Sequence, residues 1–207
     1  MPASKYRNVD LLTVLRERLR ANPGRNLPPH SYKRAAVLVP VFVRDDVPHL
    51  LLTKRTEAVE HHKGQISFPG GGEEPGDEDL LATALRETYE ELGLEPAGVE
   101  VWGRLDEIET VVSGFAITPY VGFIPQLGAL RPNPNEIDEV VAVALPVFLD
   151  PSRVRAERVM HDGRPRELLY YDCGSNVVWG ATARIIHGMV QLLAAERPES
   201  SRDLAGR

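Results

Sequence analysis

Three glutamates near the middle of the chain are spaced so that a single helix would present them together. Glu87, Glu90 and Glu91 stand at positions i, i+3 and i+4, and side chains at these spacings are neighbours on a helix surface. Like charges this close destabilise an exposed helix by roughly 0.2–0.5 kcal/mol per pair. A hard divalent cation would offset the repulsion, because Mg²⁺ prefers carboxylate oxygens. Taken alone, the cluster is more typical of a solvated acidic face, so a metal site has to be argued from the surrounding residues.

Those surrounding residues form a longer pattern. Five residues separate Gly72 from Glu78, and seven residues separate Glu78 from the segment 86–94. This segment reads Arg-Glu-Thr-Tyr-Glu-Glu-Leu-Gly-Leu. The pattern resembles the complete Nudix box, with Thr88 where an aliphatic residue is more usual. The resemblance implies a hydrolase of acid anhydrides, dependent on Mg²⁺ or Mn²⁺, that cuts a phosphoanhydride bond in a nucleoside diphosphate derivative.

The same resemblance implies a role for each position. The implied metal ligands are three carboxylates and one backbone carbonyl, those of Glu87, Glu90, Glu91 and Gly71. Glu90 and Arg86 are also implied catalytic residues, and we expect Arg86 to orient Glu78 and Glu90 through charge-assisted hydrogen bonds. The structural positions of the box are Gly72, Glu78 and Gly93.

A base that deprotonates the attacking water is expected in a loop. Glu136 follows Pro132 and Pro134, precedes a β-rich run, and fits the position of the loop acid in Nudix enzymes. Three other acids stay open as alternatives, namely Glu107, Glu109 and Glu139. Geometry rather than residue type decides which acid can serve as the base.

A second group of residues lies just upstream of the box. Residues 51–56, Leu-Leu-Thr-Lys-Arg-Thr, then Gly64, then residues 68–71, Phe-Pro-Gly-Gly, resemble the additional signature of the coenzyme A pyrophosphatase branch of Nudix enzymes. Two positions depart, since Thr56 replaces Ser or Ala and Glu60 stands where Arg is expected. Residues 110–122, 133–137 and 178–183 resemble later segments of the same branch.

This second resemblance implies hydrolysis of coenzyme A, or a derivative, to 3′,5′-ADP and 4′-phosphopantetheine. We expect the substrate to be bound by Arg55, Lys54, Lys63 and Gly70. The alternative for Lys54 and Arg55 is a pair of solvated charges at a strand edge. Glu60 keeps ADP-ribose, NADH or another nucleoside diphosphate derivative open as the substrate, and a non-catalytic nucleotide-binding module is a third interpretation.

The elements that must position these residues follow from periodicity and breakers. Helices are predicted at residues 9–21, 77–92 and 177–196. Strands are predicted at residues 35–44, 48–55, 65–68, 99–108, 116–124, 137–145 and 167–171, the first two as a hairpin. We expect an α/β fold, a Nudix-type α/β/α sandwich with a mixed sheet and a catalytic loop–helix–loop. Residues 1–34 would form an N-terminal helix and extended lead-in, 35–196 the Nudix domain, and 197–207 a mobile tail.

Composition narrows the class of protein further. A formal net charge of −6 without a basic stripe argues against nucleic-acid binding, and the apolar run at residues 35–43 is too short to span a membrane. Cys173 is the only cysteine, which excludes an internal disulfide and suits the cytoplasm. We expect Cys173 to be a packed thiol, and Trp102 and Trp179 to be core residues. A small-molecule substrate is the expected partner, and the oligomeric state is left open.

Overall fold

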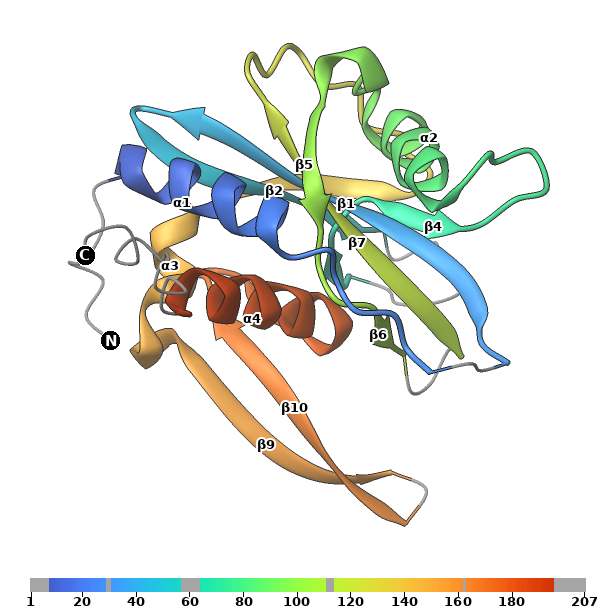
Figure 1. The fold of residues 1–207 in the computed structure, drawn as a ribbon, viewed down its shortest axis with the longest axis vertical. Helices are drawn as coiled ribbons and strands as arrows, with labels where there is room; N and C mark the ends of the chain where they lie inside the picture. The colour runs from blue at the N-terminus through green and yellow to red at the C-terminus, as the bar shows by residue number, and fades with distance from the viewer. Residues whose placement is uncertain (1–7, 29–30, 57–63, 111–113, 162, 196–207) are drawn as a thin grey trace, which may run out of the picture.

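The computed structural model describes residues 8–28, 31–56, 64–110, 114–161 and 163–195. Helices cover both faces of a central mixed sheet, and a smaller antiparallel sheet stands beside it (Figure 1). The predicted α/β sandwich is therefore confirmed. In the described part of the chain, no helix has the length and apolar character needed to cross a membrane.

The central sheet has the strand order β3-β2-β1-β7-β5, with β8 paired to β2, β4 to β1 and β6 to β7. Its strands are β1 (Lys33–Arg44), β2 (Val47–Arg55), β3 (Ile66–Ser67), β4 (Gly70–Gly72), β5 (Glu100–Arg104), β6 (Ile108–Glu109), β7 (Phe115–Ile124) and β8 (Ile137–Ala144). β1 runs parallel to β7, and the other pairs are antiparallel.

The predicted hairpin joins β1 to β2 through a tight turn. Asp45 and Asp46 have φ angles of 50° and 59°, the left-handed values that a two-residue type I′ turn requires at both positions. Asp is among the few residues other than Gly that adopt this conformation readily. The turn sets the register in which Val41 pairs with Leu50.

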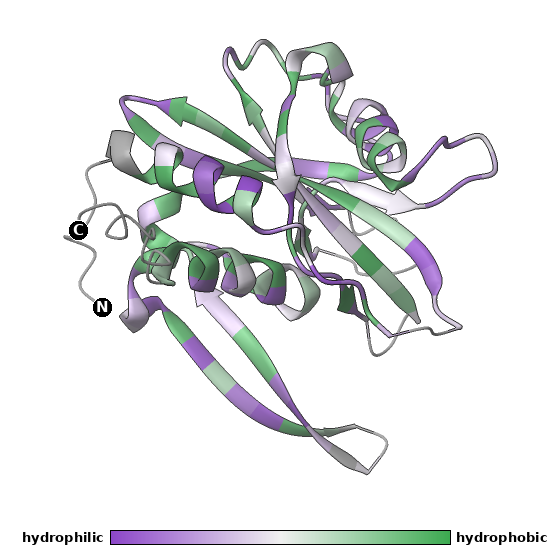
Figure 2. Ribbon diagram, in the orientation of Figure 1, coloured by the Kyte–Doolittle hydropathy of each residue, from purple (hydrophilic) through white to green (hydrophobic). Residues whose placement is uncertain are grey.

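Two hydrophobic cores flank the sheet. The helices are α1 (Asn8–Ala21), α2 (Leu80–Leu92), α3 (Leu145–Leu149) and α4 (Gly180–Ala194), with 3₁₀ turns at Pro96–Gly98 and Pro151–Arg153. Leu15 of α1 and Ile186 of α4 share one core with Leu52, whereas α2 packs over Leu51 in the other core. Consecutive residues of a strand point to opposite faces, so β2 contributes to both cores. α4 is mostly green in Figure 2, in keeping with its burial.

Several element boundaries differ from the predictions. α2 begins at Leu80 rather than at residue 77, because Asp79 is its N-cap and Asp77 bonds to side chains instead. The predicted strand 99–108 is split into β5 and β6, with a register shift beside Gly103, whose φ is 155°. The closing helix starts at Gly180, since Val177–Trp179 forms strand β11.

The smaller sheet was largely missed by the sequence patterns. It has the order β11-β10-β9, where β9 is Val154–His161 and β10 is Arg164–Asp172, and only part of β10 was predicted. The β9–β10 hairpin projects from the body of the molecule (Figure 1). Trp179, at the end of β11, is 41% exposed, so its prediction as a core residue is wrong. Trp102 is half-buried and stacks on Phe123.

Candidate active site

Helix α2 is the element that carries the three glutamates, and its two ends are firmly set. The Asp79 side chain accepts a hydrogen bond from the Ala82 N–H at 2.8 Å, which satisfies one of the free donors of the first turn. Gly93 ends the helix in the left-handed conformation at φ 66°, as predicted. The helix does not bury its glutamates equally: the exposed fraction of the side chain is 3% for Glu91, 18% for Glu87 and 53% for Glu90.

Glu91 is a buried carboxylate with weak partners. Its Oε2 accepts the Gly70 N–H at 3.4 Å, and its Oε1 lies 3.6 Å from Nη1 of Arg55. Burial raises the pKa of Glu91 to about 8; Arg55 opposes this shift, and the charges of Glu87 and Glu136 add to it. A buried charge with so little compensation is costly, and a cation would stabilise it.

Glu87 lies against the glycine strand β4. β4 pairs with β1 so that Gly71 stands opposite Ala36. A Cβ on Gly71 would lie 2.5 Å from the carboxylate carbon of Glu87, so only glycine leaves room for this contact. Burial raises the pKa of Glu87, and the neighbouring Arg86 opposes that shift.

Arg86 connects the helix to the preceding loop. Its guanidinium donates to both carboxylate oxygens of Asp77, at 2.9 and 3.1 Å, and to the Gly72 carbonyl at 3.2 Å. It also donates to Glu87 at 3.0 Å and to Glu90 at 3.2 Å. The predicted contact of Arg86 with Glu90 is therefore present. The predicted contact of Arg86 with Glu78 was wrong.

Asp77 takes the place that was expected of Glu78. Glu78 is exposed, whereas Asp77 is tied to Arg86 and to the Thr83 hydroxyl, and these hydrogen bonds hold its pKa well below the usual range. Asp77 stands nine residues before Arg86 and outside the helix. This spacing was the only signal in the sequence that could have pointed to Asp77.

The loop before β8 brings Glu136 to the same place. The backbone N–H groups of Arg131 and Asn133 donate to the carbonyls of Leu92 and Glu91, at 2.8 and 2.9 Å, and so fasten the loop to the end of α2. The Asn133 side-chain amide then donates to the Glu136 carboxylate at 3.1 Å. Glu136 is close enough that its charge raises the pKa values of Glu87 and Glu91.

Arg55 stands between two of these acids. It ends β2, and its guanidinium nitrogens lie 3.6 Å from Glu91 and 3.9 Å from Glu136. Lys54, by contrast, makes a 3.8 Å ion pair with Asp138, whose side chain is exposed. The structure therefore brings Arg55, but not the ammonium group of Lys54, into contact with the carboxylates. Lys63, Glu60 and the tail 197–207 lie outside the described residues.

The three competing acids lie in other surroundings. Glu107 accepts hydrogen bonds from the Thr118 hydroxyl and the Leu27 N–H, which ties the N-terminal segment to the sheet. Glu109 is held by Arg166 at 2.7 Å, and Glu139 is exposed on β8. Of the four acids considered as a base, Glu136 is the one whose charge acts on both Glu87 and Glu91.

The donor set at this site suits a hard divalent cation. Among the described side chains, no three His, Cys, Asp or Glu residues are already gathered as a metal cage. The carboxylates of Glu87 and Glu91 are nevertheless one helical turn apart, and both lie against the Gly70–Gly71 backbone. Carboxylate and backbone carbonyl oxygens are the ligands that Mg²⁺ and Mn²⁺ prefer. The residues that could hold the ion are Glu87, Glu91, Glu90 and the carbonyl of Gly71.

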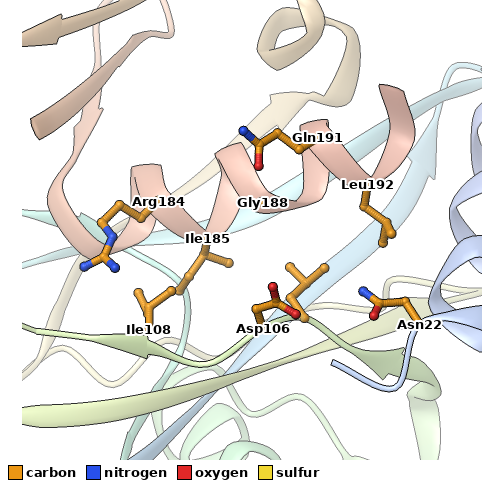
Figure 3. A pocket seen from close by; sticks show the side chains of 9 residues that line it. Asn22, Asp106, Ile108, Arg184, Ile185, Gly188, Gln191 and Leu192 are labelled. Atoms are coloured by element: carbon orange, nitrogen blue, oxygen red, sulfur yellow. The ribbon is translucent and has the colours of Figure 1, made fainter. Parts of the chain in front are cut away.

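A cavity lies elsewhere in the fold. About 270 Å³ in volume, it is bounded by α4 and the segment between β5 and β6. Figure 3 shows Arg184 at one end of this cavity and Asn22 at the other. Its apolar walls belong to the core beneath α1 and α4 and include no residue of α2. This cavity is therefore separate from the carboxylate cluster.

Cys173 is half-buried and close to its own strand. Burial raises the pKa of its thiol to about 11, and its Sγ lies 3.8 Å from the Tyr171 carbonyl oxygen. A thiol with this pKa is almost fully protonated at neutral pH and is a poor nucleophile. The structure agrees with the expected packed thiol.

Comparisons with known proteins support the resemblance of residues 72–94 to the Nudix box. A family model described as NUDIX domain matches residues 32–163. A protein of Photorhabdus laumondii subsp. laumondii, described as an uncharacterized Nudix hydrolase NudL, is 36% identical over 159 residues, covering 77% of this chain and 84% of the relative. The NudL protein of Pectobacterium atrosepticum is 34% identical over 198 residues, 96% of this chain and 100% of the relative.

A solved structure agrees at the level of the fold. The crystal structure of a MutT/nudix family protein from Enterococcus faecalis superimposes with a TM-score of 0.50 at 15% identity, covering 92% of this chain and 69% of that one. The matched family model, the two relatives and the site geometry lead to the same conclusion: the chain belongs to the Nudix family and is a hydrolase of pyrophosphate bonds in nucleoside diphosphate derivatives.

Proposed function

We propose that this Nudix hydrolase cleaves the diphosphate of coenzyme A, or of its derivatives, to give 3′,5′-ADP and 4′-phosphopantetheine, with Mg²⁺ or Mn²⁺ as cofactor. The observation that carries the proposal is the position of Arg55. This residue belongs to the segment that resembles the coenzyme A signature, and its guanidinium lies within 4 Å of both Glu91 and Glu136. A planar guanidinium is well suited to bind phosphate oxygens beside a metal site.

Other parts of the same signature gather around Arg55. Its backbone N–H donates to the Gln65 carbonyl at 3.0 Å, and the Thr56 N–H donates to the Glu136 carbonyl at 2.9 Å. A Cβ on Gly180 would lie 3.5 Å from Nε2 of Gln65. Segments that are far apart in the sequence, and that all resemble the coenzyme A branch, therefore meet beside the carboxylates.

The reaction assigns a task to each side chain. Glu87, Glu91 and the Gly71 carbonyl would hold the ion, and Glu90, the most exposed of the three glutamates, would complete the set from the solvent side. When bound there, the metal supplies charge neutralisation for the diphosphate and makes the attacking water more acidic. Arg55 binds a phosphate oxygen, and Glu136 accepts the proton that the attacking water loses as it adds to phosphorus. The bridging P–O bond breaks, and the leaving phosphate keeps that electron pair.

A direct assay tests the substrate. Incubation with coenzyme A and Mg²⁺ or Mn²⁺ should release 3′,5′-ADP and 4′-phosphopantetheine in equal amounts, separated by reversed-phase chromatography. Arg55→Ala should lose most of this activity, whereas Lys54→Ala should keep it, because Lys54 pairs with Asp138 instead. Absence of release at high enzyme concentration, together with good activity on another dinucleotide, would defeat the assignment of coenzyme A.

A second candidate substrate class follows from Glu60, an acid at a position where the coenzyme A branch has Arg. The negative charge of a carboxylate repels the 3′-phosphate of coenzyme A. ADP-ribose and NADH lack this phosphate and are therefore the alternative substrates. Comparison of coenzyme A with 3′-dephospho-coenzyme A separates the two. A tenfold preference in kcat/KM for coenzyme A, equivalent to about 1.4 kcal/mol, would support the first proposal, and the reverse preference would support the second.

A further inference from the structure

A row of stacked side chains crosses the outer face of the smaller sheet. The register pairs Tyr170 with Arg155 on one side and with Trp179 on the other, and directly paired residues point to the same face. The Tyr170 and Trp179 rings are stacked, with centroids 6.4 Å apart and an angle of 21° between their planes. The Arg155 guanidinium lies over the Tyr170 ring at 3.9 Å from its centroid.

The opposite face of the same sheet packs on the core at this point. Tyr171 and Val178, the alternating neighbours of Tyr170 and Trp179, are buried, and Tyr171 packs edge-on to Phe148. Trp179 points to the other face of the strand and is 41% exposed. The Trp179 side chain makes no capping bond to α4, so it has no evident role at the helix start either.

The Trp179 end of this row is connected to Arg55 of the carboxylate site. β11, which ends in Trp179, packs beside β3. Gln65, the residue before β3, bonds through its carbonyl to the Arg55 N–H, and its side chain approaches Gly180, the residue after Trp179. Trp179 is therefore linked to Arg55 through its neighbour Gly180 and through Gln65. A nucleotide that extends from its diphosphate across the β3 edge would meet the exposed Trp179 ring.

We propose that Trp179 binds the adenine ring of the substrate by stacking, and that Tyr170, packed between Arg155 and Trp179, holds the indole in place. This inference rests on the proposed function, because it requires a substrate that carries an adenine nucleotide on its diphosphate. Stacking suits this surface because Trp179 stands at the end of the row and is 41% exposed, and every base has a flat π face. The geometry thus assigns the nucleotide half of the substrate to the smaller sheet and the reacting phosphates to α2.

Binding can be measured without turnover. Trp102 is the only other tryptophan in the chain and is half-buried against Phe123. Titration of the metal-free protein with 3′,5′-ADP should quench tryptophan fluorescence in a saturable way. The Trp102→Phe variant should keep the quench, and Trp179→Phe should lose it. Pyrophosphate and 4′-phosphopantetheine, which contain no base, should give no quench.

Steady-state kinetics provide the second readout. Trp179→Ala should raise KM for the adenine substrate about tenfold with kcat changed less than twofold, because stacking contributes to binding and not to the reacting bond. Tyr170→Ala should behave in the same way, and Tyr170→Phe, which keeps the ring, should restore the wild-type KM. Val177→Ala is the matched control, since Val177 is an exposed apolar residue on the same strand and is not part of the stack.

The outcomes separate this inference from the proposed function. Quenching that persists in Trp179→Phe, or an unchanged KM in Trp179→Ala, would overturn the stacking assignment even if coenzyme A is hydrolysed. Tryptophan fluorescence that falls with rising protein concentration, and not with rising nucleotide concentration, would also overturn it. A second copy of the chain would then cover the rings. Loss of coenzyme A activity with an intact 3′,5′-ADP quench would defeat the coenzyme A substrate alone.

Discussion

At the scale of single residues, Glu91 is the most unusual group in the molecule. It is 3% exposed, its closest cationic partner is 3.6 Å away, and burial raises its pKa to about 8. Enzymes place such poorly compensated groups where function requires them, at a cost in stability. The structure therefore gives opposite expectations for the stability and the activity of a neutral variant.

The first prediction concerns the metal-free protein with Glu91→Gln. The folded-state pKa lies above the ordinary value of 4.5, so the folded wild type binds more protons than the unfolded chain between pH 4.5 and 8. Its free energy of unfolding should consequently fall as pH rises through this window. Glutamine does not titrate, and the variant should be more stable than the wild type at pH 8 by about 1 kcal/mol or more. Urea denaturation in EDTA at pH 5 and pH 8 measures the free energy of unfolding of both proteins. If this free energy changed with pH equally in the wild type and the variant, Glu91 would not be responsible for the loss of stability.

The second prediction concerns the base. Glu136→Gln should lower kcat by roughly 10²–10⁴-fold and leave KM nearly unchanged, because the carboxylate acts on the water and not on substrate binding. Glu139→Gln is the control, since Glu139 is also an acid of this region but lies exposed on β8. Equal rates for the two variants would remove Glu136 from the mechanism.

Sequence reasoning predicted Glu87, Glu91, Arg86 and Glu136 as site residues because the box and the loop acid are short-range patterns, and the structure brings these residues together. It could not show that Glu91 is buried while Glu90 is exposed, since this depends on where β4 and Arg55 approach the helix. The exchange of Glu78 for Asp77 was missed for the same reason. Only the folded loop decides which acid faces the guanidinium.

At the scale of elements, strand β4 and helix α2 function as one unit. The backbone at Gly71 approaches the Glu87 carboxylate so closely that a Cβ would lie 2.5 Å from it. The loop before β8 is fastened to the other end of α2 by two backbone hydrogen bonds. The two attachments hold the glycine strand and Glu136 around one helix face.

A third prediction tests this unit. Gly71→Ala should displace the Glu87 side chain and weaken activity at least tenfold, while the melting temperature changes by only a few degrees. Gly76→Ala is the matched control, because a Cβ at Gly76 would meet nothing within 4 Å. Full activity of Gly71→Ala would mean that Glu87 does not need its present position.

The elements that the sequence predicted best are those with local signals. The β1–β2 hairpin has its Asp-Asp turn, and α2 has an N-cap and a glycine stop. β9 was missed because its charged and apolar residues do not alternate cleanly, as expected for a hairpin that projects from the body. The Asp162-Gly163 pair was the available signal, since Asp-Gly is a frequent hairpin turn.

At the scale of the whole molecule, the sheet separates two cores with different tasks. One core, beneath α2, supports the carboxylates, and the other, beneath α1 and α4, joins the N-terminal and C-terminal helices to the sheet. Leu15 and Leu19 of α1 are buried in the second core. The N-terminal helix is therefore an integral layer of the fold, although the matched family model begins after it, at residue 32.

The fourth prediction follows from this separation. Leu15→Ala should lower the free energy of unfolding by about 2–5 kcal/mol, because Leu15 is fully buried and leaves a cavity. Its KM and kcat at 20 °C should stay near those of the wild type, since the affected core lies across the sheet from α2. Chemical denaturation and initial rates measured on the same preparation check both expectations. A changed KM at unchanged stability would contradict the separation of the cores.

Calorimetric titration with Mn²⁺, in the presence of 3′,5′-ADP, tests most directly whether Glu87 and Glu91 hold a divalent cation. The wild type should take up Mn²⁺ saturably, and Glu91→Gln should bind it at least tenfold more weakly although it folds as well or better. Absence of uptake by the wild type, or equal affinity in the two proteins, would contradict the metal site on which the proposed hydrolysis depends.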